Sequence, residues 1–127
     1  MIEFMLLIRN EVDHQAQWTQ DQHRQFLKKC EEYVSSLKDE GRLKSAQPLV
    51  REGRMISKQA GEWNEEPFHK EKEVIVGYYH ILAKDLGDAI AIAKRNPEIE
   101  YGTTASIEVR PIKTKEVTTG FAYPTHV

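Results

Sequence analysis

The chain has 127 residues, of which 39% are hydrophobic and 30% are charged, and its formal net charge is −2. This length predicts one domain with a real hydrophobic core, and the near-neutral charge gives no electrostatic reason to expect a nucleic-acid partner. No apolar run approaches the roughly 20 residues of a membrane-spanning helix, and the only cysteine, Cys30, excludes an internal disulfide and a multi-cysteine metal site. We therefore expect a cytoplasmic protein without a membrane partner.

The first half of the chain predicts a strand, a long helix and an edge strand. Residues 4–8, Phe-Met-Leu-Leu-Ile, form an apolar run typical of a strand covered on both faces, and the start of the chain lacks the basic residues of a signal peptide. Thr19 with Gln22 three positions later is a capping-box pattern, which predicts a helix that ends at Gly41. The apolar face of this helix consists of Phe26, Cys30, Tyr33, Val34 and Leu37. Residues 43–51 then predict a strand that its proline restricts to an edge or a bulge.

The second half predicts further strands and a shorter helix. The strands expected are residues 54–58, 74–82 and 106–112. Residues 60–64 are expected to form a loop, and a charged segment of residues 65–73 leads into the longest of the three strands. The helix has Asp85 as its N-cap and stops at Asn96-Pro97.

The resulting order, β-α-β(β)-β-α-β, predicts an α+β protein with a ferredoxin-like fold, in which two helices cover one face of an antiparallel sheet. The other face of such a sheet is bare, and the strands carry more apolar residues than two short helices can cover. We therefore expect a homodimer whose two sheets pack together into a closed barrel. Residues 1–113 form the domain, and residues 114–127 form a C-terminal tail that we expect to dock on the partner subunit.

Four short motifs carry a resemblance to a known family. They are residues 4–8, Glu40-Gly41-Arg42-Leu43, Pro67-Phe68 with Lys72-Glu73, and Tyr101-Gly102 with Glu108-Val109-Arg110-Pro111-Ile112. With these motifs, residues 1–113 resemble the YCII-related family, in the subgroup named for a DGPF motif, which belongs to the dimeric α/β-barrel superfamily. The naming motif is degraded here, because Glu65 and Glu66 stand where the subgroup has Asp and Gly.

The resemblance implies a dimeric barrel with a cleft between the helices and the sheet. It also implies an enzymatic role, which a His–Asp pair suggests for some members of the family. In this chain Asp39 matches the Asp, but Cys30 occupies the position of the His. Some relatives lie beside genes for extracytoplasmic-function sigma factors, which implies a regulatory partner.

Five residues are predicted for a site near the sheet and the dimer interface. The catalytic candidates are His80 and Asp39, and the ligand-binding candidates are Arg42, Glu73 and Tyr78. Two interpretations of His80 stand about equal: an acid–base group in a cleft, or a hydrogen-bonded histidine in a core or dimer face. Glu73 and His80 are seven residues apart, so a regular strand points them to opposite faces. We therefore expect His80 to act with a tyrosine or an acid from another element.

Structural interpretations compete with these roles. Cys30 is either a nucleophile or a small buried hydrophobe, and the frequent burial of cysteine favours the second. Asp39 and Arg42 either bind a polar ligand or form surface ion pairs, and again the second is favoured. The chain lacks metal-ligand spacings, phosphate loops and dinucleotide-binding motifs, so we expect no metal and no cofactor.

Two function classes stay open. The first is a small-molecule-binding protein or enzyme, for which a deep cavity beside His80 would be evidence. The second is a non-catalytic regulatory or interaction module, for which a filled interior and an exposed apolar patch outside the dimer interface would be evidence.

Overall fold

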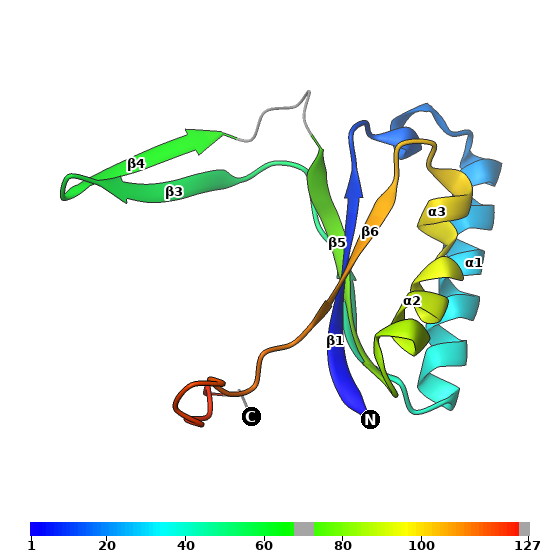
Figure 1. Cartoon of the computed structure of the whole chain (residues 1–127). Coiled ribbons are helices and arrows are strands. Elements are labelled where there is room, and N and C mark those ends of the chain that lie inside the picture. The colour runs from blue at the N-terminus through cyan, green and yellow to red at the C-terminus, as the bar shows by residue number, and fades with distance from the viewer. Residues whose placement is uncertain (68–72, 125–127) are drawn as a thin grey trace.

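The structure, a computed structural model, describes residues 1–67 and 73–124 of the chain (Figure 1). Its strands are β1 Ile2–Asn10, β2 Leu43–Pro48, β3 Arg54–Gln59, β4 Glu62–Pro67, β5 Val74–Ala83 and β6 Ser106–Pro111. Its helices are α1 Gln20–Asp39, α2 Leu86–Lys94 and α3 Pro97–Tyr101, and a 3-10 turn, η1, covers His14–Gln17. No helix in these described parts is long and apolar enough to span a membrane.

Four of the strands form one antiparallel sheet in the order β2-β5-β1-β6, with β5 and β1 in the centre. The helices all lie on one face of this sheet (Figure 1). This arrangement confirms the predicted ferredoxin-like α+β fold. It also confirms that the proline-containing strand β2 is an edge strand.

Local signals at the helix starts explain where the two main helices begin. The Thr19 hydroxyl accepts a bond from the Gln22 N–H at 3.1 Å, and the Gln22 side chain accepts one from the Thr19 N–H at 2.9 Å. The predicted capping box is therefore confirmed. Asp85 caps α2 in a similar way, since its carboxylate accepts the Asp88 N–H at 2.8 Å.

The hydrophobic core lies between the sheet and the helices, and alternation along the strands decides which side chains enter it. In β1, Phe4, Leu6 and Ile8 are buried, whereas the residues between them are only half-buried. The central core residues on the other elements are Tyr33, Leu37, Ile81, Ala83, Ala89, Ile92 and Ala93. The opposite face of the sheet, which we call the open face, carries Met5, Leu7, Tyr78, His80 and Leu82.

The segment between β2 and β5 differs from the prediction. The loop expected over residues 60–64 is wrong beyond Gly61, because β4 begins at Glu62 and pairs with β3 in a separate two-stranded sheet. This hairpin, which we call the arm, projects from the side of the sheet opposite the helices (Figure 1). Most of the charged segment expected at residues 65–73 lies outside the described residues, and its first three residues belong to β4.

The region after α2 contains an element that the sequence did not predict. Asn96-Pro97 ends α2 as expected, but it also starts the short helix α3. The side-chain oxygen of Asn96, Oδ1, accepts a hydrogen bond from the Glu98 N–H at 2.9 Å. Pro97 lies in the first turn, where its missing N–H removes no hydrogen bond from the helix. This turn positions Glu98 beside α1.

Candidate functional site

A cavity of about 570 Å³ lies between α1 and the β2–β5 side of the sheet, and we call it the α1 cleft. Apolar atoms make up most of the surface that lines it, and its apolar lining residues are Ile8, Phe26, Leu27, Val34, Ala46, Pro48 and Val76. Its polar lining side chains are Gln15, His23, Cys30, Glu31, Gln47, Tyr79 and Glu98. A mostly apolar cavity of this size with a few polar groups is typical of a small-molecule site.

The cleft continues toward the end of the sheet where β1 ends. A second hollow of about 340 Å³ shares Gln15, Pro48, Val76 and Glu98 with the first. Trp18 lines this part, and its ring packs on Phe26 at 4.9 Å between centroids. The aromatic packing fixes the segment before α1 against the helix.

The floor of the α1 cleft holds a cluster of polar groups in an apolar setting. Burial raises the pKa of Tyr79, and the neighbouring Cys30, Tyr33 and Glu98 raise it further. Tyr33 packs edge-on against Tyr79 at 5.3 Å between ring centroids, and its hydroxyl donates to the Ile92 carbonyl at 2.9 Å. Both phenols therefore stay protonated at neutral pH and act as hydrogen-bond donors.

Asn96 lies behind this floor and is 2% exposed. Its amide nitrogen is buried and has no hydrogen-bond partner within the described residues. The amide nevertheless lies close enough to the hydroxyls of Tyr33 and Tyr79 to lower the pKa of each. The unpaired donor of Asn96 thus lies behind the side chains that line the cleft and not in its lining.

Glu98 and Cys30 are the two remaining titratable groups of the cluster. Burial raises the pKa of the Glu98 carboxyl. Burial also raises the pKa of the Cys30 thiol to about 11, and the nearby Glu98 adds to the rise. The thiol is therefore protonated at neutral pH, which disfavours the nucleophile interpretation and favours Cys30 as a lining group.

The model of the YCII-related domain matches residues 2–113, which is most of the chain. The chain belongs to the YCII-related family. None of the curated proteins searched matches it. The roles of individual residues in this YCII-related protein therefore have to come from its own geometry.

Two of the predicted site residues, His80 and Tyr78, lie on the open face and not in the α1 cleft. The Nε2 atom of His80 is 2.9 Å from the Glu3 Oε1 atom, and Lys44 Nζ is 3.6 Å from the same oxygen. The hydrogen bond with His80 is the main reason that the pKa of Glu3 is lowered. The side chain of His80 is 15% exposed, and its acidic neighbour Glu3 belongs to another strand, β1.

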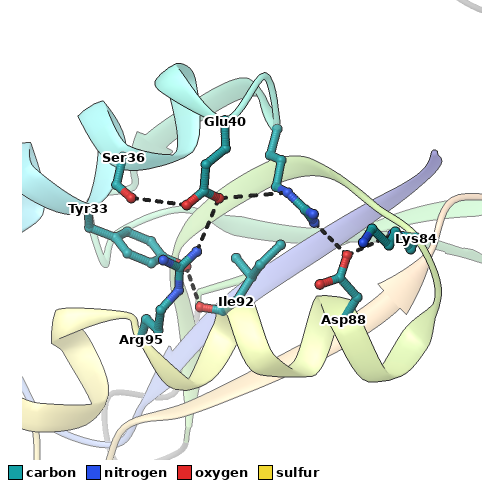
Figure 2. A network of polar contacts seen from close by, with 8 residues as sticks. Tyr33, Ser36, Glu40, Lys84, Asp88, Ile92 and Arg95 are labelled. Atoms are coloured by element: carbon teal, nitrogen blue, oxygen red, sulfur yellow. Dashed lines mark hydrogen bonds and ion pairs between the residues drawn. The ribbon is translucent and has the colours of Figure 1, made fainter.

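Arg42 lies at the far end of the molecule, where α1 meets α2. It forms ion pairs with Asp88 and with Glu40, the latter at 3.7 Å between Nε and Oε2. Glu40 also pairs with Arg95 at 3.5 Å, and the Asp88 carboxylate accepts the Lys84 N–H. Figure 2 shows these side chains together. These contacts tie the end of α1 to α2, which is the structural interpretation that was favoured for Arg42.

The other two predicted residues, Asp39 and Glu73, also lie outside the α1 cleft. Asp39 is exposed at the last position of α1. Glu73 precedes β5 and accepts a hydrogen bond from the Ser106 hydroxyl at 2.6 Å. The five residues therefore do not gather in one cleft, and their catalytic and binding roles stay predictions.

The residues that do gather, Tyr79, Glu98 and Asn96, were not among those predicted. Alternation along the strand offered a signal for Tyr79, because it lies two positions from the buried Ile81 and so shares the helix-covered face. Asn96-Pro97 followed by Glu98 is a helix-start signal as well as the stop that it predicts for α2. Within the described residues, no group of three or more His, Cys, Asp or Glu side chains is arranged to hold a metal ion.

Proposed function

We propose that this YCII-related protein binds a small molecule in the α1 cleft. The single observation that carries the proposal is the convergence of Tyr79, Glu98 and Cys30 in a cavity whose lining is otherwise mainly apolar. Such a site favours a ligand with an apolar body and one polar group. The polar group would meet the floor, and the apolar body would lie along Phe26, Leu27 and Val34.

The floor favours a ligand that carries a carbonyl or a related acceptor oxygen. Tyr79 stays protonated and is a donor to such an oxygen. Glu98, whose pKa is raised by burial, is a candidate acid–base group of the cleft, which His23 also lines. If the protein is an enzyme, the geometry therefore supports proton transfer next to a carbonyl, with Glu98 as the acid–base group and Tyr79 as the donor.

A thermal-shift screen with small carbonyl compounds and carboxylic acids tests binding, because a ligand at about 100 times its Kd stabilises the native state by about 2.7 kcal/mol. Ala46 lies on β2 opposite Tyr79 and lines the cleft, so Ala46→Phe fills the cavity. Ser35→Phe, on an exposed position of α1, is the matched control. We expect hits for the natural chain and the control but not for Ala46→Phe. Equal shifts in all three proteins would place the binding elsewhere.

We also propose that the protein is a homodimer that buries its open face. Support comes from the apolar residues Met5, Leu7 and Leu82, which no described element of the same chain covers. In that dimer, His80 and Glu3 form a polar pair inside the interface. Membership of the DGPF-type subgroup belongs to this proposal too, since the family match leaves the subgroup open.

A second candidate function is the interaction module. The arm supports it, because Met55, Ile56 and Trp63 are exposed there. A link to an extracytoplasmic-function sigma factor is the form that the family resemblance suggests. Retention of such a factor from a lysate by the natural chain, and its loss after Trp63→Ser, would favour this candidate.

A further inference from the structure

The arm, β3 Arg54–Gln59 with β4 Glu62–Pro67, has no substantial packing against the other described elements. Among the described elements, the extensive contacts of β3 and β4 are only with each other, whereas each strand of the main sheet also packs against a helix or a further strand. An isolated two-stranded hairpin is at best marginally stable in water. The arm also exposes Trp63 to 71%, together with Met55 and Ile56. These features indicate that something outside the described chain covers the arm.

We infer that the arm of each protomer embraces a second copy of this chain and packs along the edge of its sheet. This inference rests on the proposed homodimer through the open face. The arm leaves the end of the sheet where β2 finishes, and it extends on the open-face side (Figure 1). The segment after β6 leaves the opposite end of the sheet and extends to the same side (Figure 1). A second sheet against the open face would lie between these two projections.

The dimensions fit this arrangement. Strands of six residues make the arm about 20 Å long, whereas two packed sheets lie only about 10 Å apart. The arm therefore reaches past the sheet of the second copy and alongside its edge. Its outer end carries Lys58 and Trp63, with the Lys58 Nζ 5.2 Å from the centre of the indole ring.

The footprint of the arm adds to that of the open face. Four strands of six to ten residues cover roughly 500 Å², given about 4.8 Å between strands and 3.3 Å per residue. One face of the arm adds roughly 200 Å² by the same dimensions. The arm therefore enlarges by about two fifths the footprint that each copy can offer to a dimer.

Charge complementarity also supports a second copy of this chain as the partner of the arm. On the open face, Glu108 lies between Arg9 at 3.4 Å and Arg110 at 3.5 Å, so two basic groups flank one acidic group at the β6 rim. The strand β4 carries Glu62, Glu65 and Glu66, and none of them is in an ion pair within residues 1–67 and 73–124. With these three acidic side chains against Arg54 and Lys58 on β3, the arm has a slight excess of negative charge, which complements the arginine-flanked rim of a second copy.

Sedimentation equilibrium of four variants tests the inference. The arm variants are Ile56→Ser combined with Trp63→Ser, and replacement of residues 54–67 by a short Gly-Ser linker. Ile90→Ser, an exposed apolar position on α2 on the helix side, is the matched control. Leu7→Arg places a charge on the open face and tests the homodimer itself. Since the arm does not pack on the core, the arm variants should keep the secondary structure of the natural chain.

We expect both arm variants to raise the dimer dissociation constant about tenfold or more, as loss of a buried Trp commonly does, and Ile90→Ser to leave it unchanged. Hydrogen exchange of the β3 and β4 amides should slow as protein concentration rises through the dissociation constant. A natural chain that is a dimer, with arm variants of equal affinity and fast exchange in the arm, overturns the inference and leaves the homodimer in place. A monomeric natural chain overturns both.

Discussion

Tyr33→Phe tests how the floor of the α1 cleft is held together. The Tyr33 hydroxyl joins α1 to α2 through its 2.9 Å bond to the Ile92 carbonyl, and the residue is 6% exposed. The substitution removes this bond but keeps the ring that packs on Tyr79. The Ile92 carbonyl is not orphaned, because it still accepts the Arg95 N–H at 3.2 Å. We therefore expect a loss of about 1 kcal/mol, the net value of one neutral buried hydrogen bond, and not the larger cost of an unpaired buried group.

Urea unfolding followed by circular dichroism measures this loss. With a slope near 2 kcal/mol per molar urea, the midpoint should fall by about 0.5 M, and Tm by about 4 °C. Tyr33→Ala, which also removes the ring from the core, should cost about 3–5 kcal/mol. A Phe variant as unstable as the Ala variant, or as stable as the natural chain, would refute the reasoning.

The natural chain and Tyr33→Phe should also differ in how their stability changes at alkaline pH. Burial raises the pKa of Tyr33 from 10.0 to about 12. The folded state thus holds this proton more tightly than the unfolded state, so its contribution to stability is complete below pH 10 and is lost as the pH rises toward 12. Two pKa units correspond to about 2.7 kcal/mol. Tyr33→Phe has no such loss. The plots of unfolding free energy against pH for the natural chain and for this variant should therefore cross near pH 11, where the loss about equals the free energy of the missing hydrogen bond.

Three further predictions follow from the site and from α1. Glu98→Gln should stabilise the protein at neutral pH and leave its stability unchanged below pH 4. The reason is that the natural chain loses stability as the pH rises through the raised pKa of Glu98 in the folded state. Urea unfolding at the two pH values measures whether the substitution stabilises as expected. Cys30 in the folded chain should react with iodoacetamide at pH 8 about 100-fold more slowly than in the urea-unfolded chain. A pKa of about 11 leaves about 0.1% of the folded thiol as thiolate at this pH. Equal rates in the two states would show that the thiol is not buried as described. Thr19→Ala removes the capping box of α1 and should cost about 1 kcal/mol of unfolding free energy, and no change in the urea midpoint would count against the cap.

The fold was predictable because its main elements carry strong local signals. The capping box at Thr19, the alternation along residues 106–112 and the apolar runs of β1 and β5 each predict the element that the structure has. The order of these elements then selects a ferredoxin-like sheet. Tertiary contacts were not needed to place any of them.

The strand β4 was missed because its sequence opposes the usual signals. Glu62-Trp63-Asn64-Glu65-Glu66-Pro67 is mainly polar and acidic, and such residues are depleted in strands. The turn before it has positive φ at both Ala60 and Gly61, at 49° and 82°. Hairpin turns of that type normally carry Asn-Gly or Asp-Gly, so the alanine hid the turn.

The site was harder to predict than the fold because a single position decides which face a strand residue occupies. His80 and Tyr79 are neighbours on β5, yet one lies on the open face and the other in the α1 cleft. Both faces of β5 are apolar enough to be buried, so the sequence does not show which of them the helices cover. Glu98 became a candidate only through its burial beside α1, which is a tertiary property.

The most direct test of the central proposal is a fragment titration followed by amide and methyl NMR spectra of the natural chain. Small carbonyl compounds and carboxylic acids should shift the signals of residues that line the α1 cleft, such as Leu27, Val34 and Ala46. Ala46→Phe should abolish these shifts. Shifts confined to the open face around His80, or to the groove between α2 and β6, would contradict a ligand site beneath α1.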